Sequence, residues 1–196
     1  VKHSATILDP SEIGQLLRSI DAYSGSMVVR AALRLSPLLF VRPGELRTMQ
    51  WDEIDWQKSC WEIPASKMKM REPHVVPLAN QSAEILEALR PLTGRGMFVF
   101  PSARKGGRPL SDNGVRTALR SLGYTNEQIT PHGFRAMART LLDEELGFRI
   151  DYIEHQLAHT VKDPLGRAYN RTKHLSERTE MMQRWADYLD QLRRGR

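Results

Sequence analysis

The chain has 196 residues, 40% of them hydrophobic and 27% charged, with a formal net charge of +6 at pH 7. This length and composition fit one globular domain and exclude disordered, collagen-like and membrane-spanning classes. A single cysteine, Cys60, excludes an internal disulfide and a cysteine-based zinc site, and together with the lack of a signal-peptide pattern it favours a reducing, cytoplasmic setting.

The first half of the chain predicts three helices followed by a small sheet. Asp9 suits a helix N-cap and Pro10 the first helical position, and apolar residues then recur on one face. The apolar stretch 27–40 predicts a buried helix that Pro37 bends or ends, and a short helix follows from Pro43. The predicted strands are 53–56, 60–63 and 74–78.

The second half is predicted to be helical. The helical period returns over 82–89, 112–122, 134–146, 151–157 and 176–192. The predicted fold class is therefore mainly α with a small three-stranded antiparallel β-sheet. Between the first two of these helices, the basic and glycine-rich stretch 101–109 predicts a surface loop.

Positive charge is concentrated in residues 101–140. Seven basic residues against two acidic ones give this stretch +5 of the chain's +6. Such a concentration suits a polyanion such as a nucleic-acid backbone, although a solvated basic face explains the same composition.

Two short patterns place an arginine near a helix start. Arg42 has Glu45 three residues on, a spacing that puts both side chains on one helical face; in isolation it is more often a surface ion pair. His132 and Arg135, also three residues apart, can point at one anion together with the free backbone amides of a helix start. A capping histidine beside a solvated arginine is the alternative interpretation.

Two further patterns involve lysines and histidines. The loop 66–72 between two predicted strands is charged, as solvated hairpin loops usually are. His155 and His159 have a zinc-binding spacing, but Gln156 stands where a metalloprotease needs a glutamate, so zinc hydrolysis is not predicted. His74, a lone histidine in a strand, is interpreted as structural.

Taken in chain order, these patterns resemble the catalytic domain of the tyrosine recombinases, or phage integrases, especially those of prophages and genomic islands. The resemblance extends from the first helix to Trp185. The signature of this family is an arginine in an Arg-x-x-Glu context, a hairpin lysine, a His-x-x-Arg pair, a further His or Trp, and a nucleophilic tyrosine. The matching residues here are Arg42, Glu45, Lys69, His132, Arg135, His159 and Tyr169.

Two of these assignments involve a choice. Lys69 stands eight residues before Pro77, which is the usual place of the family lysine, and Lys67 is the alternative. Tyr169 is chosen by its place after His159. The other tyrosines are Tyr23, Tyr124, Tyr152 and Tyr188. One departure from the family pattern is Phe40-Val41 before the first arginine, where many members carry Thr-Gly.

The resemblance implies a site-specific DNA recombinase that cleaves and rejoins DNA strands through a 3′-phosphotyrosyl intermediate, for integration or excision of a mobile element. The residue types suit that chemistry, because guanidinium groups bind phosphate oxygens in pairs, a phenol is a fitting nucleophile, and lysine and histidine move protons. No metal and no cofactor are expected, since the sequence has neither clustered carboxylates for a two-metal site nor a nucleotide-triphosphate loop.

The resemblance also implies partners. The expected partners are double-stranded DNA attachment sites and accessory DNA-bending proteins. The chain is expected to be a monomer when free and to form a homotetramer on DNA, and no membrane is involved. The expected location is the bacterial cytoplasm, at the nucleoid. The expected DNA contacts are Arg104, Lys105, Arg108, Lys67 and Arg71. Because the chain starts at Val1, we expect a catalytic domain over 1–196 without an N-terminal DNA-binding region.

Two alternatives remain for the function and two for the last helix. A type IB topoisomerase shares the chemistry, and a DNA-binding module without catalysis shares the fold. The helix 176–192 has a continuous apolar face, and the family resemblance favours docking of that face on a neighbouring protomer, whereas packing in its own core explains it equally. The apolar positions are Met181, Trp185, Leu189 and Leu192.

Overall fold

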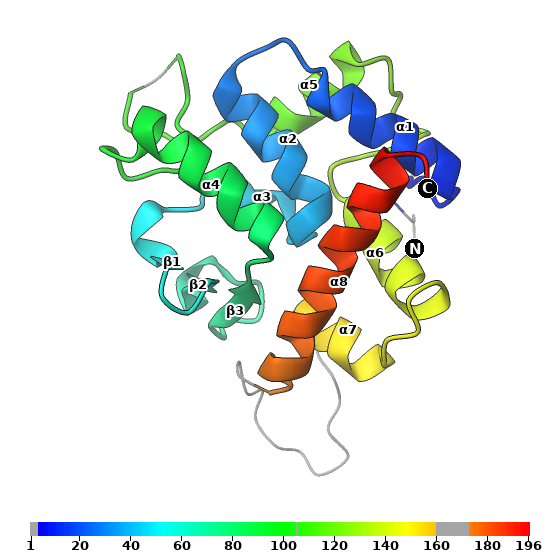
Figure 1. Cartoon of the computed structure of the whole chain (residues 1–196). Coiled ribbons are helices and arrows are strands. Elements are labelled where there is room, and N and C mark those ends of the chain that lie inside the picture. Colours follow the sequence, from blue (N-terminus) through cyan, green and yellow to red (C-terminus); the bar gives the residue numbers. More distant parts are fainter. Residues whose placement is uncertain (1–3, 105, 160–172) are drawn as a thin grey trace.

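The structure is a computed structural model, and it describes residues 4–104, 106–159 and 173–196. The helices are α1 (Pro10–Asp21), α2 (Met27–Leu39), α3 (Pro43–Arg47), α4 (Asn80–Thr93), α5 (Gly114–Ser121), α6 (Gly133–Glu144), α7 (Ile150–Gln156) and α8 (Leu175–Arg193). The strands are β1 (Ile54–Asp55), β2 (Cys60–Ile63) and β3 (His74–Pro77), and two 3-10 turns are η1 (Trp51–Glu53) and η2 (Ala65–Lys67). The predicted fold class is confirmed (Figure 1).

The first two helices begin as the sequence predicts. The Asp9 carboxylate accepts a hydrogen bond from the Glu12 amide at 3.0 Å, and Ser26 caps α2 in the same way. Pro37 does not end α2, which continues to Leu39 and stops where Phe40 adopts a left-handed φ of 38°. A non-glycine residue in that region is strained by about 1–2 kcal/mol, so tertiary contacts must hold it there.

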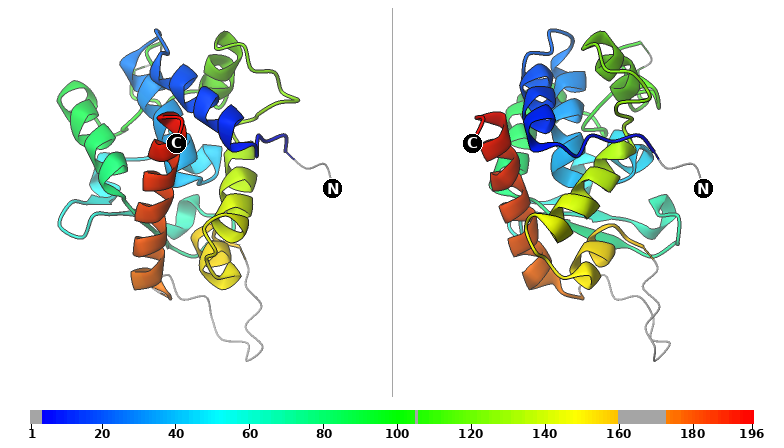
Figure 2. Two further views of the ribbon diagram at one scale, coloured as in Figure 1. Left: turned by 45° about the vertical axis from the view of Figure 1, so that its right-hand side comes forward. Right: turned by 90° about the vertical axis from the view of Figure 1, so that its right-hand side faces the viewer.

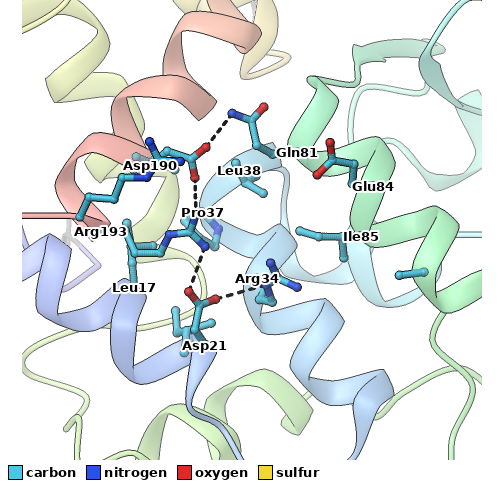
Figure 3. A pocket seen from close by; sticks show the side chains of 14 residues that line it. Leu17, Asp21, Arg34, Pro37, Leu38, Gln81, Glu84, Ile85, Asp190 and Arg193 are labelled. Atoms are coloured by element: carbon cyan, nitrogen blue, oxygen red, sulfur yellow. Dashed lines mark hydrogen bonds and ion pairs between the residues drawn. The ribbon is translucent and has the colours of Figure 1, made fainter.

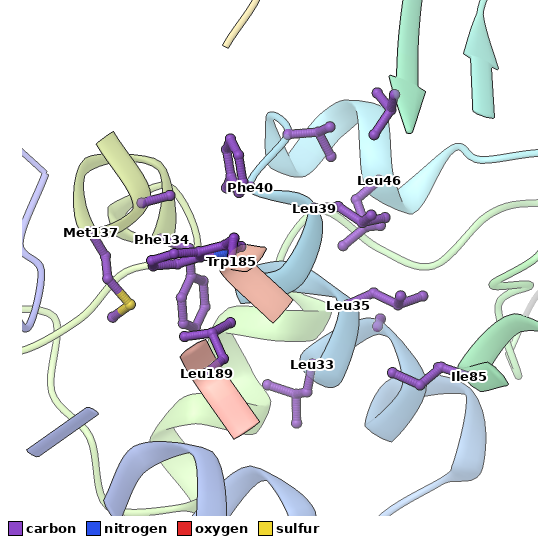
Figure 4. Close-up of a cluster of buried hydrophobic side chains, with 14 of the residues drawn as sticks. Leu33, Leu35, Leu39, Phe40, Leu46, Ile85, Phe134, Met137, Trp185 and Leu189 are labelled. Carbon is purple, nitrogen blue, oxygen red and sulfur yellow. The ribbon is translucent and has the colours of Figure 1, made fainter. Parts of the chain in front are cut away.

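Helix α2 lies at the centre of the fold and contacts α1, α4, α5, α6 and α8. Trp185 of α8 is completely buried, its indole N–H donates to the Pro37 carbonyl at 2.8 Å, and its ring meets that of Phe40 edge to face. Figure 4 shows Trp185 among side chains of α2 and α6, with Phe134 and Leu189 beside it. Burial of such a side chain stabilises the fold by about 3 kcal/mol.

The packing of α8 corrects one expectation. The face predicted to dock on a neighbouring protomer is buried in the core of its own chain, where α8 contacts α1, α2, α7 and β3. Its residues Met181, Trp185, Leu189 and Leu192 are at most 7% exposed. The alternative interpretation, a helix that closes its own core, is the one the structure supports.

The sheet has the order β1-β2-β3, and both pairs of strands are antiparallel. Trp61 pairs with Ile54 on one side and with Val76 on the other. The β2–β3 hairpin projects from the sheet on the side away from α8 (Figure 2, right). A loop that carries Lys69 is therefore held at one edge of the molecule.

A cavity of about 360 Å³ lies between α1, α2, α4 and α8. Asp21 spans its rim by pairing with Arg34 and with Arg193 (Figure 3). None of the described candidate site residues lines it. Among the helices in the described ranges, none combines the length and the hydrophobicity that crossing a bilayer requires.

Candidate active site

Arg42 stands at the N-cap position of α3, with Pro43 at the first helical position. The carboxylate of Glu45 accepts one hydrogen bond from the Arg42 backbone amide and one from its guanidinium, both at 3.0 Å. Glu45 is 5% exposed, so the expected ion pair is partly buried rather than on the surface. The reciprocal contact fixes the direction of the arginine, because its backbone amide and its guanidinium are held by the same carboxylate.

Arg135 lies in the first turn of α6 and is 6% exposed. Its guanidinium donates to the Phe40 carbonyl at 2.9 Å and to the Leu157 carbonyl at 2.8 Å, and Nη2 lies 3.3 Å from Nε2 of His159. Burial, and then the like charge of Arg42, lowers the pKa of Arg135 to about 10, so the group remains a cation at neutral pH. The ends of α2 and α7 therefore meet the start of α6 at one guanidinium.

His132 immediately precedes α6, and its side chain is only partly covered by the protein. Partial burial of the ring, followed by the positive charges of Arg135 and Arg42, lowers the pKa of His132 below its ordinary value. The ring is therefore neutral at pH 7 and can both donate and accept a hydrogen bond. In the structure, His132 thus lies close enough to Arg42 and Arg135 for both positive charges to act on its ring.

His159 follows α7 and is half-buried, with its side chain 40% exposed. Nδ1 lies 2.6 Å from a carboxylate oxygen of Glu154, while Nε2 faces Arg135. Glu154 was not among the residues that the sequence singled out. Its only signal in the sequence is an acidic residue one helical turn and a half before a histidine, which is too common to indicate a site.

The two hairpin lysines have different surroundings. The ammonium of Lys67 donates to the Thr48 carbonyl at 2.7 Å and forms an ion pair with Glu53. Protein acceptors therefore contact the Lys67 ammonium in this structure, and its expected DNA contact stays a prediction. Lys69 is exposed at the tip of the hairpin. Of the two candidates for the family lysine, Lys69 is the more exposed one, and its assignment stays a prediction.

A buried polar layer lies beneath this group, between β3, α7 and α8. His74 is 2% exposed, and its Nε2 donates to the Gln156 carbonyl at 3.0 Å. Arg178 is completely buried and donates to the Gln156 side chain at 3.0 Å and to the Val75 carbonyl. These contacts tie the hairpin strand to the two helices on either side of residues 160–172, in agreement with the structural interpretation of His74.

The zinc-like spacing of two histidines does not bring their rings together. His155 is buried and meets the ring of His174 at 5.4 Å, whereas His159 faces Arg135. Within the described parts of the chain, no group of three or more His, Cys, Asp or Glu side chains could hold a metal ion.

The remaining candidates lie at the surface or outside the described residues. Arg71, Arg104 and Arg108 are exposed, and the basic loop is closed at its base by a bridge between Pro101 and Pro109. Tyr169 and Lys105 lie outside the described residues.

Solved structures share this fold. The integrase from mycobacterium phage Brujita superposes with a TM-score of 0.68 at 14% identity, over 98% of this chain and 63% of that one. Lambda integrase, as a dimer bound to a COC′ core site, has a TM-score of 0.61 at 18% identity, over 87% of this chain and 63% of that one. The fold is that of a tyrosine recombinase catalytic domain.

Sequence comparison identifies the family. The model of the phage integrase family matches residues 6–175. The integrase of Enterobacteria phage P4 is 41% identical over an alignment of 197 positions, which covers 93% of this chain and 45% of that protein. The prophage integrase IntA of Escherichia coli (strain K12) is 40% identical over 186 residues, covering 95% and 45% respectively. The chain belongs to the phage integrase family, and it spans about half the length of these relatives.

Proposed function

We propose that this chain is the catalytic domain of a site-specific DNA recombinase, which cleaves and rejoins DNA one strand at a time through a 3′-phosphotyrosyl intermediate. Integration or excision of a mobile element is the biological role that the family supports. The reaction proceeds by exchange of phosphodiester bonds and needs neither a metal nor a nucleotide cofactor.

The observation that carries the proposal is that Arg42 lies near enough to the buried Arg135 for their charges to repel each other. The positive charge of Arg42 opposes protonation of Arg135, and both charges act on His132. Glu45 already pairs with Arg42, but one carboxylate offsets only part of the charge of two guanidinium groups held near each other. A phosphodiester supplies further negative charge, and two planar guanidinium groups can bind its non-bridging oxygens as negative charge builds up on them.

The other residues fit the remaining steps of the reaction. The Tyr169 hydroxyl attacks phosphorus, its proton passes to a neighbouring base, and the bond to the 5′ oxygen breaks. Lys69 donates the proton that the leaving 5′ oxygen takes up. His132 and His159 supply hydrogen bonds or move protons at the phosphate, and Glu45 supports Arg42.

The partners follow from the same proposal. The substrate is double-stranded DNA at attachment sites, with the exposed Arg71, Arg104 and Arg108, and also Lys105, against its phosphates. A homotetramer assembles on DNA from protomers that are monomers when free, and accessory bending proteins assist at the site. The protein acts at the nucleoid in the bacterial cytoplasm.

A nicked suicide substrate tests the proposal. Cleavage beside the nick releases a short fragment, so the covalent protein–DNA adduct accumulates and is visible on a denaturing gel. The expected result is an adduct with the wild-type chain and none with Arg135→Lys, which keeps the charge but loses the paired geometry. Absence of adduct in both proteins, with DNA binding retained, would favour a binding module. Relaxation of supercoils without strand exchange would favour the topoisomerase alternative.

A further inference from the structure

Glu154 contacts His159, which lies three residues beyond the end of α7, at two points. Its carboxylate Oε2 lies 2.6 Å from Nδ1 of His159, and its backbone carbonyl accepts the His159 amide at 3.0 Å. Ala158 stands between them in the left-handed region, with φ at 51°, and its own amide donates to the His155 carbonyl at 3.1 Å. These bonds form a Schellman motif, so the ring of His159 is fixed by the local ending of a helix as well as by a side chain.

A second residue fixes the carboxylate itself. Nε of Arg139, on α6, donates to Oε1 of Glu154 at 2.6 Å. Burial opposes ionisation of Glu154, but the hydrogen bonds from His159 and Arg139 prevail and hold its pKa below the ordinary value. Glu154 is thus a carboxylate at neutral pH, and each of its two oxygens has its own donor.

The contacts of His159 determine which ring nitrogen carries the proton. A carboxylate can only accept a hydrogen bond, so Nδ1 must be protonated. A guanidinium can only donate, so Nε2, 3.3 Å from Arg135 Nη2, presents its lone pair. With the opposite tautomer, two donors would face each other at Arg135 and two acceptors at Glu154.

We infer that Glu154 is a positioning residue, which selects the Nδ1–H tautomer of His159 and directs Nε2 at the Arg135 side of the phosphate site. This deepens the proposed function and rests on it for its catalytic meaning. The ring then presents an acceptor at Nε2 on the side of Arg135, and a proton that reaches Nε2 gives an imidazolium whose charge faces the Glu154 carboxylate. Supporting groups of this kind typically change activity by about 10- to 100-fold.

The test combines a spectroscopic and a kinetic measurement on the same variants. Long-range proton–nitrogen correlation spectra of histidine-labelled protein report the tautomer, with the His159 signals assigned from their loss in His159→Gln. We expect the Nδ1–H pattern in the wild type and in Glu154→Gln, which keeps an acceptor. We expect its loss in Glu154→Ala, together with adduct formation slowed by about 10- to 100-fold. The matched control Glu144→Ala, at an exposed carboxylate of α6, changes neither reading.

Two results would overturn the inference. One is an Nε2–H pattern for His159 in the wild type, and the other is a Glu154→Ala variant that keeps the Nδ1–H pattern and the wild-type rate. Arg139→Gln removes the ion pair between Arg139 and Glu154 but keeps the contact between Glu154 and His159, so it should leave the tautomer of His159 unchanged. A wild-type chain with the expected tautomer but no adduct on suicide DNA would refute the proposed function and leave the positioning of the ring intact.

Discussion

His74 should limit the stability of the fold in mild acid. Burial, followed by the positive charges of Arg178, Arg135 and Arg42, lowers its pKa from 6.5 to about 3, with only the hydrogen bond to the Gln156 carbonyl acting in the opposite direction among the larger effects. The unfolded chain takes up a proton at this ring near pH 6.5, whereas the folded chain does not until about pH 3. Stability is therefore lost as the pH falls through this window.

The magnitude follows from the width of the window. Each pH unit below 6.5 costs about 1.4 kcal/mol for one proton, so lowering the pH from 7 to 5 should remove about 2 kcal/mol through His74. The carboxyl groups of Glu154 and Asp151 also lose their contribution on acidification, because hydrogen-bonded partners outweigh burial and lower their pKa values. Their loss falls mainly below pH 5, which is why the comparison stops there.

Urea unfolding at pH 5, 6 and 7 measures the effect. The variant His74→Gln keeps a donor for the Gln156 carbonyl but cannot titrate, so its free energy of unfolding should vary by about 2 kcal/mol less than that of the wild type over this range. His132→Gln, at a ring exposed to solvent, is the matched control and should remove less of the pH dependence. Equal pH dependence of the wild type and His74→Gln would refute the assignment of a buried, neutral ring.

Three further outcomes follow from the structure. Lys69→Ala should lose adduct formation and regain it on DNA with a 5′ sulfur leaving group, because such a group hardly needs a proton. Lys67→Ala should instead lower the urea midpoint of unfolding, because it leaves Glu53 without its ion pair. Ala158→Gly should raise the free energy of unfolding by about 0.5–1 kcal/mol, since glycine relieves the left-handed strain at some entropic cost; a lower midpoint would contradict the Schellman ending. The double change Arg104→Ala and Arg108→Ala should flatten the salt dependence of DNA binding, by about 0.9 in log–log slope per lost contact, and an unchanged slope would place the loop away from DNA.

The features predicted correctly from the sequence depend on neighbouring residues. Asp9 and Pro10 mark the start of α1, and the three-residue spacing of Arg42 and Glu45 indicates the contact that the structure contains. The order of the elements follows the change from helical to strand periodicity. Local geometry determines each of these features, so a short window of sequence contains the information.

The features that were missed depend on residues far apart in the chain. Lys67 is distinguished from Lys69 by Glu53, and Glu154 acquires Arg139 as a partner only when α6 packs on α7. The left-handed conformation of Phe40 has no signal in the residue type, because a carbonyl contact with Arg135 and an aromatic contact stabilise it. Periodicity also shows that α8 has an apolar face without showing what covers it.

Formation of the phosphotyrosyl bond tests the central claim most directly. The wild-type chain and Tyr169→Phe are each incubated with a nicked suicide site, and the trapped adduct is digested and mapped by mass spectrometry. The account predicts an adduct in the wild type with the DNA 3′ phosphate on Tyr169, and unchanged DNA affinity without adduct in Tyr169→Phe. An adduct that persists in Tyr169→Phe, or one that maps to Tyr152 or Tyr188, would contradict it.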